Sequence, residues 1–235
     1  MKKIRFPGEA AYLVALVVLA FAVAMTAASD LGVSMIVAPA YILSLKVEVL
    51  TFGQSEYIVQ GLLFVVFCVL MRRVKAVYFS AFITGLLYGA VLDLWRLIIP
   101  HFNPAVTPIG SLPLPVRILY FIGGTVLCAA CIALFFHTYL YPQIYDFFVK
   151  GVSARFHLNR TRFKIIYDAS FLVIACAMSL VLFHKFVGVG VGTLITTAVN
   201  GVLIGFFDKV LDKYFDFTPW LPRLAAHFAL EKGAE

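Results

Sequence analysis

The sequence is poor in charged residues. Only 13% of its 235 residues are Asp, Glu, Lys or Arg, whereas 63% are apolar. Soluble domains carry roughly a quarter charged and about half apolar residues, so this chain has too few polar side chains to cover a surface that faces water. The deficit excludes a soluble globular domain. We expect a polytopic membrane protein of α-helices, because a spanning segment must satisfy its own backbone polar groups.

The sequence also lacks the motifs of common catalytic and cofactor sites. It has no metal-ligand spacing, phosphate-binding loop, nucleophile elbow or pair of carboxylates at a useful separation, so we expect no enzyme, no cofactor and no metal site. All of its few cysteines lie in apolar stretches, at Cys68, Cys128, Cys131 and Cys176. We expect them to pack as small apolar side chains, although Cys128 and Cys131 leave a thiol relay or soft-metal site as an alternative.

Six apolar stretches are long enough to cross about 30 Å of hydrocarbon, for which a helix needs about 20 residues. They cover approximately residues 10–29, 52–71, 76–99, 118–139, 165–183 and 186–207. The first follows three basic residues, as in a signal peptide, but it exceeds the usual apolar region of about 7 to 15 residues. We therefore predict an all-α polytopic bundle of about six transmembrane helices in a single membrane domain, residues 1–235.

Basic residues are distributed unevenly among the connections. All but four of the 19 Lys and Arg residues precede the first stretch, follow the second, separate the fourth from the fifth, or follow the sixth. Basic loops stay in the cytoplasm, so both termini are predicted to be cytoplasmic, with residues 213–235 as an interfacial tail. The same rule explains the net charge of +7 without a nucleic-acid partner.

Two segments fit neither a loop nor a span. Residues 31–50 are apolar but broken by Gly32 and Pro39, and residues 140–156 contain Pro142 and Gly151. Such residues favour short half-helices that lie at the interface or re-enter the protein. The alternative is that both segments cross, which would give eight spans.

The third and sixth stretches resemble each other. At an offset of about 116 residues, Gly85 and Gly89 fall on Gly201 and Gly205. Two repeats are therefore predicted, over residues 10–100 and 115–212. Three spans in each would make the repeats inverted, whereas four would make them parallel. Each glycine pair has the Gly-x-x-x-Gly spacing of closely packed helices, and we expect it to pack the two halves together, with chance spacing as the alternative.

Polar residues within spans are the candidates for function, because they are costly in a membrane. Gln54, Glu56 and Gln60 lie in the first turns of the second stretch. Glu56 and Gln60 are four residues apart on one helical face, where they can hold a cation or an amine. A position of Glu56 among lipid headgroups is the alternative.

A second candidate region opens the sixth stretch. The glycine run at residues 187–193 exposes backbone N–H groups that can receive an anion, and Thr193, Thr197 and Asn200 continue a polar stripe. Helix packing around glycine is the alternative.

The other polar residues within the spans have plausible structural roles. Asp93 and Arg96 are spaced for a local ion pair, Asp168 follows Lys164 by one turn, and Asp208 closes the sixth stretch.

Several short runs resemble a known group of proteins. They are LGVSMIVAPAYILS at residues 31–44, LTFGQSEYIVQG at 50–61, LMRRVK at 70–75 and VGVGT at 189–193. Together they resemble the YczE/YyaS/YitT-type bacterial membrane proteins over most of the chain, although the first half lacks the Gly-x-Gly-Thr of the second. The resemblance implies a multi-pass protein of the bacterial plasma (inner) membrane and supplies no catalytic residues.

The repeat and the paired broken segments favour a small-solute transporter or permease, with a site between the two halves. Its predicted lining residues are Gln54, Glu56, Gln60, Thr193, Thr197 and Asn200. The alternatives are a substrate-binding membrane subunit of a multi-part importer and a scaffold that does not transport. The sequence leaves open whether a homo-oligomer or an energising partner is required, and the lipid bilayer and an unknown solute are the expected partners.

Overall fold

The computed structural model describes residues 3–222 and 225–226 and is a bundle of α-helices. Within these residues, six helices are long and apolar enough to cross a membrane, which confirms the predicted all-α polytopic bundle and implies a lipid bilayer as its surroundings. They are α1 (Gly8–Ser29), α3 (Phe52–Met71), α4 (Ala76–Ile98), α5 (Leu114–Phe136), α7 (Arg160–Phe183) and α8 (Val191–Tyr214).

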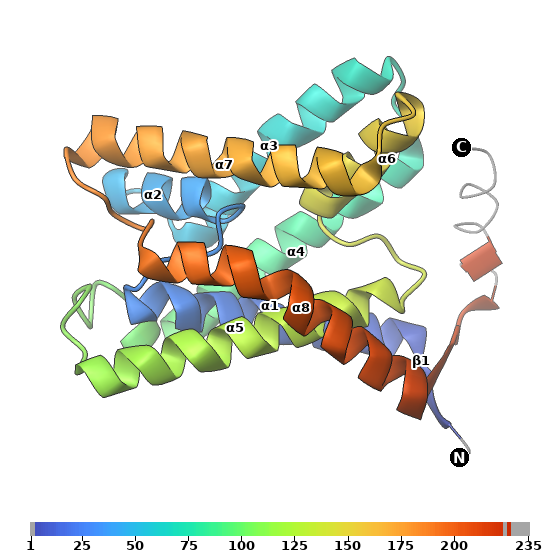
Figure 1. The fold of residues 1–235 in the computed structure, drawn as a ribbon, viewed down its shortest axis with the longest axis horizontal. Coiled ribbons are helices and arrows are strands. Elements are labelled where there is room, and N and C mark those ends of the chain that lie inside the picture. Colours follow the sequence, from blue (N-terminus) through green and yellow to red (C-terminus); the bar gives the residue numbers. More distant parts are fainter. Residues whose placement is uncertain (1–2, 223–224, 227–235) are drawn as a thin grey trace.

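The two broken segments each form one short helix. They are α2 (Ala38–Lys46) and α6 (Ile144–Arg155), of nine and twelve residues, and a 3₁₀ turn, η1 (Pro100–Phe102), follows α4. At 1.5 Å per residue, α2 and α6 measure about 14 and 18 Å, well short of a membrane crossing. Both pack against α3 and α7, near opposite ends of α7 (Figure 1). The segments therefore lie within the bundle as half-helices.

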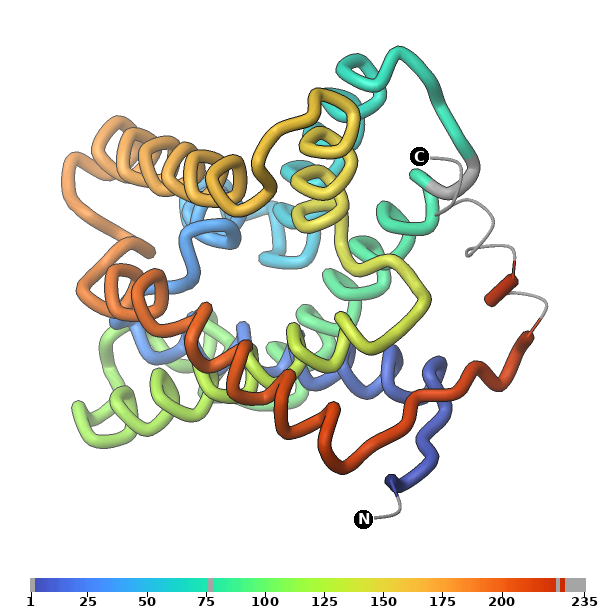
Figure 2. The backbone as a smooth tube through the Cα atoms, turned by 45° about the vertical axis from the view of Figure 1, so that its right-hand side comes forward, coloured from blue at the N-terminus to red at the C-terminus, as the bar shows by residue number. Residues whose placement is uncertain are grey.

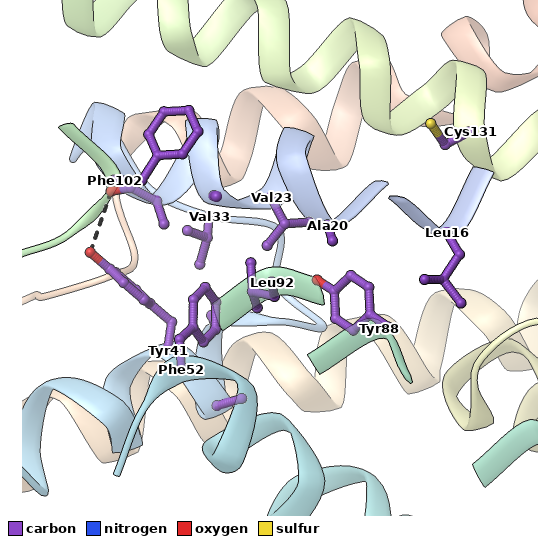
Figure 3. Packing of buried hydrophobic residues seen from close by; sticks show 14 of the residues in the cluster. Leu16, Ala20, Val23, Val33, Tyr41, Phe52, Tyr88, Leu92, Phe102 and Cys131 are labelled. Atoms are coloured by element: carbon purple, nitrogen blue, oxygen red, sulfur yellow. Dashed lines mark hydrogen bonds between the residues drawn. The ribbon is translucent and has the colours of Figure 1, made fainter. Parts of the chain in front are cut away.

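The core is built around α1, which packs along the length of α5 and also against α4. Small residues permit this close approach: Ala11, Ala15 and Ala20 of α1 are fully buried. Gly124 of α5 lies against the backbone carbonyl of Ala22, where a Cβ atom would be only 2.7 Å from the oxygen. Figure 3 shows how larger side chains of α1 and α4 meet in the same core.

One end of the bundle, called here the sheet end, carries a small parallel sheet. Strand β1 (Ile4–Pro7) pairs with β2 (Phe215–Thr218), and Ile4 lies opposite Phe215. Just inside it, the Glu9 carboxylate accepts hydrogen bonds from the Tyr139 hydroxyl (2.5 Å) and from the backbone N–H groups of Trp220 and Leu221. The described part of the predicted tail therefore returns to α1. Its residues 223–224 and 227–235 lie outside the described residues.

The glycine pairs do not pack the two halves together, so that prediction was wrong. Gly85 and Gly89 of α4 instead face α3 of the same half, where a Cβ atom would collide with the side chains of Gln60 and Tyr57. Gly201 and Gly205 of α8 have nothing within 4 Å of the position that a Cβ would take. The spacing permits close packing of two helices but does not select the partner, and here α1 and α5 join the halves.

Candidate functional site

Glu56 and Gln60 lie together inside the bundle, as their spacing on α3 predicts. Both side chains are 0% exposed, and the Gln60 Nε2 donates a hydrogen bond to Glu56 Oε2 at 3.0 Å. The start of α3 is fixed by a capping box, in which Thr51 Oγ1 accepts from the Gln54 N–H and Gln54 Oε1 accepts from the Thr51 N–H. Gln54 is therefore exposed and serves the cap rather than the site.

The short helix α6 and the residue before it supply the remaining polar groups. The Tyr145 hydroxyl donates to Glu56 Oε2 at 2.9 Å, and Gln143 Oε1 accepts from Gln60 Nε2 at 3.3 Å. Neither residue was predicted from the sequence. The only sign of Gln143 and Tyr145 in the sequence is that polar residues stand within an apolar broken segment. Their contact with α3 depends on the fold. We call Glu56, Gln60, Gln143 and Tyr145 the polar cluster.

The polar cluster lies deep in the bundle. Gln60 packs against Gly85, the tenth residue of the 23-residue helix α4, and so stands near the middle of that helix. Glu56 is one turn, or about 6 Å, closer to the beginning of α3. Tyr88, also in the central part of α4, is 1% exposed. These positions favour mid-membrane depth for the polar cluster over the headgroup region.

Hydrogen bonding within the polar cluster is uneven. Two donors converge on Glu56 Oε2, whereas Glu56 Oε1 and Gln60 Oε1 are buried without a hydrogen-bond partner. Among the described residues, no lysine, arginine or histidine forms an ion pair with Glu56. An isolated carboxylate in such a place is costly. The arrangement suits a carboxyl group that holds a proton or another positive charge.

A cavity of about 100 Å³ adjoins the polar cluster. Gln143 and Tyr145 line it from one side, and Asn200 of α8 lines it from another, with a buried Oδ1 atom that has no hydrogen-bond partner. The volume is sufficient for several water molecules or a small solute. Of the residues predicted for the second candidate region, Asn200 therefore lines the cavity.

A larger cleft of about 720 Å³ continues from this cavity between α6, α7 and α8. The two share Phe135, Phe136, Pro142 and Asp146 as lining residues. Basic side chains also line the cleft, including Lys164, which pairs with Asp146 at 3.4 Å and with Asp168 at 3.0 Å. The second pair is the one that the sequence predicted. Both α7 and α8 contribute residues to the lining of the cleft. The two helices lie apart in Figures 1 and 2.

Thr193 and Thr197 do not line the cavity. The Thr193 hydroxyl donates to the Val33 carbonyl at 2.8 Å, and the Gly192 N–H donates to the Leu31 carbonyl at 2.8 Å. Thr197 is exposed and its hydroxyl donates to the Thr193 carbonyl at 2.7 Å. The glycine run thus packs against the connection between α1 and α2, as the alternative reading of this run proposed.

The remaining polar residues of the spans hold helix ends and connections. Asp93 accepts hydrogen bonds from the Thr51 hydroxyl and from the Gly53 N–H (2.8 Å), which caps α3. Arg96 donates to the Phe102 carbonyl at 3.2 Å. Asp208 lies 3.0 Å from the Nε2 atom of His137, which joins α8 to the end of α5. Asp93 and Arg96 therefore bind other groups instead of forming the local ion pair that their spacing suggested.

Comparison with known proteins gives a family without an assigned activity. No curated protein and no solved structure matches the chain. A family model, described as a family of unknown function, matches residues 7–209, which include every helix of the bundle except the last residues of α8. The chain therefore belongs to the family of unknown function DUF6198.

Proposed function

We propose that this protein is a transporter of a small solute, which moves through the cleft and the cavity past the polar cluster. The observation that carries the proposal is the deep position of Glu56 and Gln60 next to a cavity that continues into a cleft. Buried ionisable groups at membrane depth are costly and commonly mark pathways for solutes or ions. The unpartnered oxygen of Asn200, which lines the cavity, favours a solute that donates hydrogen bonds.

The arrangement of the short helices supports an inverted repeat. α2 of the first half packs against α7 of the second, and α6 of the second half packs against α3 of the first. The two short helices lie near opposite ends of α7 (Figure 1). Inverted repeats would place them in this way, and broken helices around a central site are common in transporters of this design.

The proposed orientation places the sheet end in the cytoplasm. Arg72, Arg155 and Arg160 lie in connections or at helix ends that the predicted topology puts on the same side as both termini. The resemblance noted in the sequence extends this proposal to the bacterial plasma membrane. In this orientation the cleft is the cytoplasmic entrance.

Cysteine accessibility tests the proposal without knowledge of the solute. Asn200→Cys, in a background without native cysteines, is treated with a membrane-impermeant thiol reagent in right-side-out and inside-out vesicles. A transporter exposes its central site alternately, so we expect labelling from both sides. Val106→Cys, in the connection after α4, and Arg155→Cys, at the end of α6, report outer and cytoplasmic access and serve as matched controls. Labelling of Asn200→Cys from one side only, under every condition, would contradict transport.

A binding subunit of a multi-part importer is the second candidate function. It is favoured by α8, where a Cβ atom added at Gly201 or Gly205 would have nothing within 4 Å, which leaves a surface for an energising partner. Such a subunit would copurify with its partner, and Gly201→Leu would disrupt the copurification. A transporter that works alone would instead move solute in liposomes, as measured by mass spectrometry of a loaded solute mixture.

A further inference from the structure

The basic residues on the elements packed against α3 have other contacts, and among them Arg155 at the end of α6 lies over the Phe156 ring. On the elements packed against α3, the Lys46 Nζ of α2 donates to the Leu182 carbonyl at 3.0 Å, and Lys150 of α6 lies over the Tyr141 ring. Arg96 of α4 lies over the Phe52 ring and also donates to a carbonyl. These basic side chains of α2, α4 and α6 are therefore not counter-charges for Glu56.

The acidic groups on the same elements also have their own partners. Asp93 of α4 caps α3, and Asp146 of α6 pairs with Lys164. The titratable group hydrogen-bonded to Glu56 is the phenol of Tyr145, which is a neutral side chain in its ordinary form. Glu56 is thus a fully buried carboxyl group whose surroundings supply hydrogen bonds but no positive charge.

We infer that Glu56 is a proton-binding site that carries its proton on Oε1. Two donors occupy Oε2, and Oε1 is the oxygen left without a partner. A proton there removes the charge that burial would otherwise penalise. On release, the O–H bond breaks, its electron pair remains on the carboxylate, and the proton passes to a water molecule that reaches the carboxyl group.

The space around the carboxyl group favours a proton over a metal cation. A metal cation needs several oxygen ligands with room around it. Only Glu56 Oε1 and Gln60 Oε1 are unpartnered within the polar cluster, and Gln60 Oε1 lies against Gly85, where there is no space even for a Cβ atom. The polar cluster therefore lacks a coordination shell for a metal ion.

The proton would link Glu56 to the wall of the cleft. Tyr145 donates to Glu56 from α6, and α6 residues line both the cavity and the cleft. Hydrogen bonds to an ionised carboxylate are roughly twice as strong as those to a neutral one, so proton release would tighten the contact between α3 and α6. This coupling role rests on the proposed transport function, whereas proton binding itself does not.

Infrared difference spectroscopy of the purified protein in lipid tests the site directly. We expect the carbonyl stretching band of a protonated carboxylic acid at neutral pH, lost in Glu56→Gln. It should be retained in the matched control Asp168→Asn, which removes a carboxylate from another span where it is paired with Lys164. Wild-type and Glu56→Gln spectra that coincide in this region would overturn the proposal.

Two further measurements separate the outcomes. The carbodiimide DCCD reacts with protonated carboxyl groups in apolar surroundings, and we expect mass spectrometry to find its adduct on Glu56, increasing as the pH falls. If Na⁺ at constant pH instead shifts carboxylate bands and blocks the adduct, Glu56 binds an alkali cation and the proton assignment is wrong. A protonated Glu56 together with one-sided labelling of Asn200→Cys would sustain proton binding while transport fails.

Discussion

The helix pairs α3–α4 and α7–α8 contain glycines at matching positions but pack differently. Gly85 and Gly89 bring α4 so close to α3 that neither position has space for a Cβ atom. Gly201 and Gly205 meet nothing within 4 Å, and α7 packs against α2 and α6 instead of α8. The cleft occupies the space between α7 and α8. The same glycine spacing is thus used in one half and unused in the other.

This difference suggests how the protein would change state if the proposed transport function holds. In transporters with inverted repeats, the halves exchange arrangements around a fixed site. Packing of α8 on α7 through Gly201 and Gly205 would close the cleft at the sheet end. Separation of α3 from α4 would then open Glu56 and Gln60 toward the opposite end.

The largest effect is expected from a substitution that disrupts the tighter helix pair, α3–α4. Gly85→Leu forces a side chain into the space that Gln60 occupies, and we expect it to lower the free energy of unfolding by about 3 kcal/mol or to prevent folding. Gly201→Leu is the matched control, since it places the same side chain at the corresponding open position. Thermal unfolding in detergent measures both variants. Equal losses would show that the two pairs are not packed differently.

A disulfide cross-link tests whether the open helix pair, α7–α8, can close. Ile165 of α7 and Gly201 of α8 line opposite walls of the cleft. In a background without native cysteines, we expect Ile165→Cys with Gly201→Cys to form a disulfide under mild oxidation only when the helices close, because a disulfide needs Cα atoms within about 7 Å. Gel mobility detects the bond. If no oxidant produces it while each single thiol reacts readily, α7 and α8 remain apart.

The sheet end supplies a smaller test, because it holds the far end of α8. Glu9→Gln replaces a carboxylate that accepts from Tyr139 and from two backbone N–H groups. We expect a loss of about 1–2 kcal/mol and faster proteolysis after Tyr214, since bonds to charged groups are the stronger ones. Tyr139→Phe, which removes only one of these bonds, should lose less. An unchanged proteolysis rate in Glu9→Gln would show that the contact does not hold α8.

The smallest effect concerns the opposite end of the contact between α1 and α5. Asp30 pairs with Arg117 at 3.0 Å, yet burial raises the pKa of Asp30 above its usual value, although Arg117 acts to lower it. A raised folded-state pKa means that stability is lost as pH rises through it. Asp30→Asn should therefore flatten the fall in melting temperature as the pH rises above about 4, the usual pKa of an aspartate. A slope identical to that of the native protein would contradict this assignment.

The six spans could be predicted because hydropathy and length decide them before any tertiary contact forms. The pairing of Glu56 with Gln60 was also predictable, because four-residue spacing on a helix fixes a common face. Gln143 and Tyr145 could not be placed, since they reach α3 across 83 and 89 residues of chain. The hydrogen bond from the Thr193 hydroxyl to the Val33 carbonyl could not be predicted either, because it joins residues 160 positions apart.

The parallel pairing of β1 with β2 has a consequence for the order of folding. It joins the segment before the first span to the segment after the last, and Glu9 meets Trp220 across 211 residues of sequence. During synthesis β1 must therefore wait, without its partner strand, until every span has been made. A chain that stops before Phe215 would present an open strand edge to the cell's proteases.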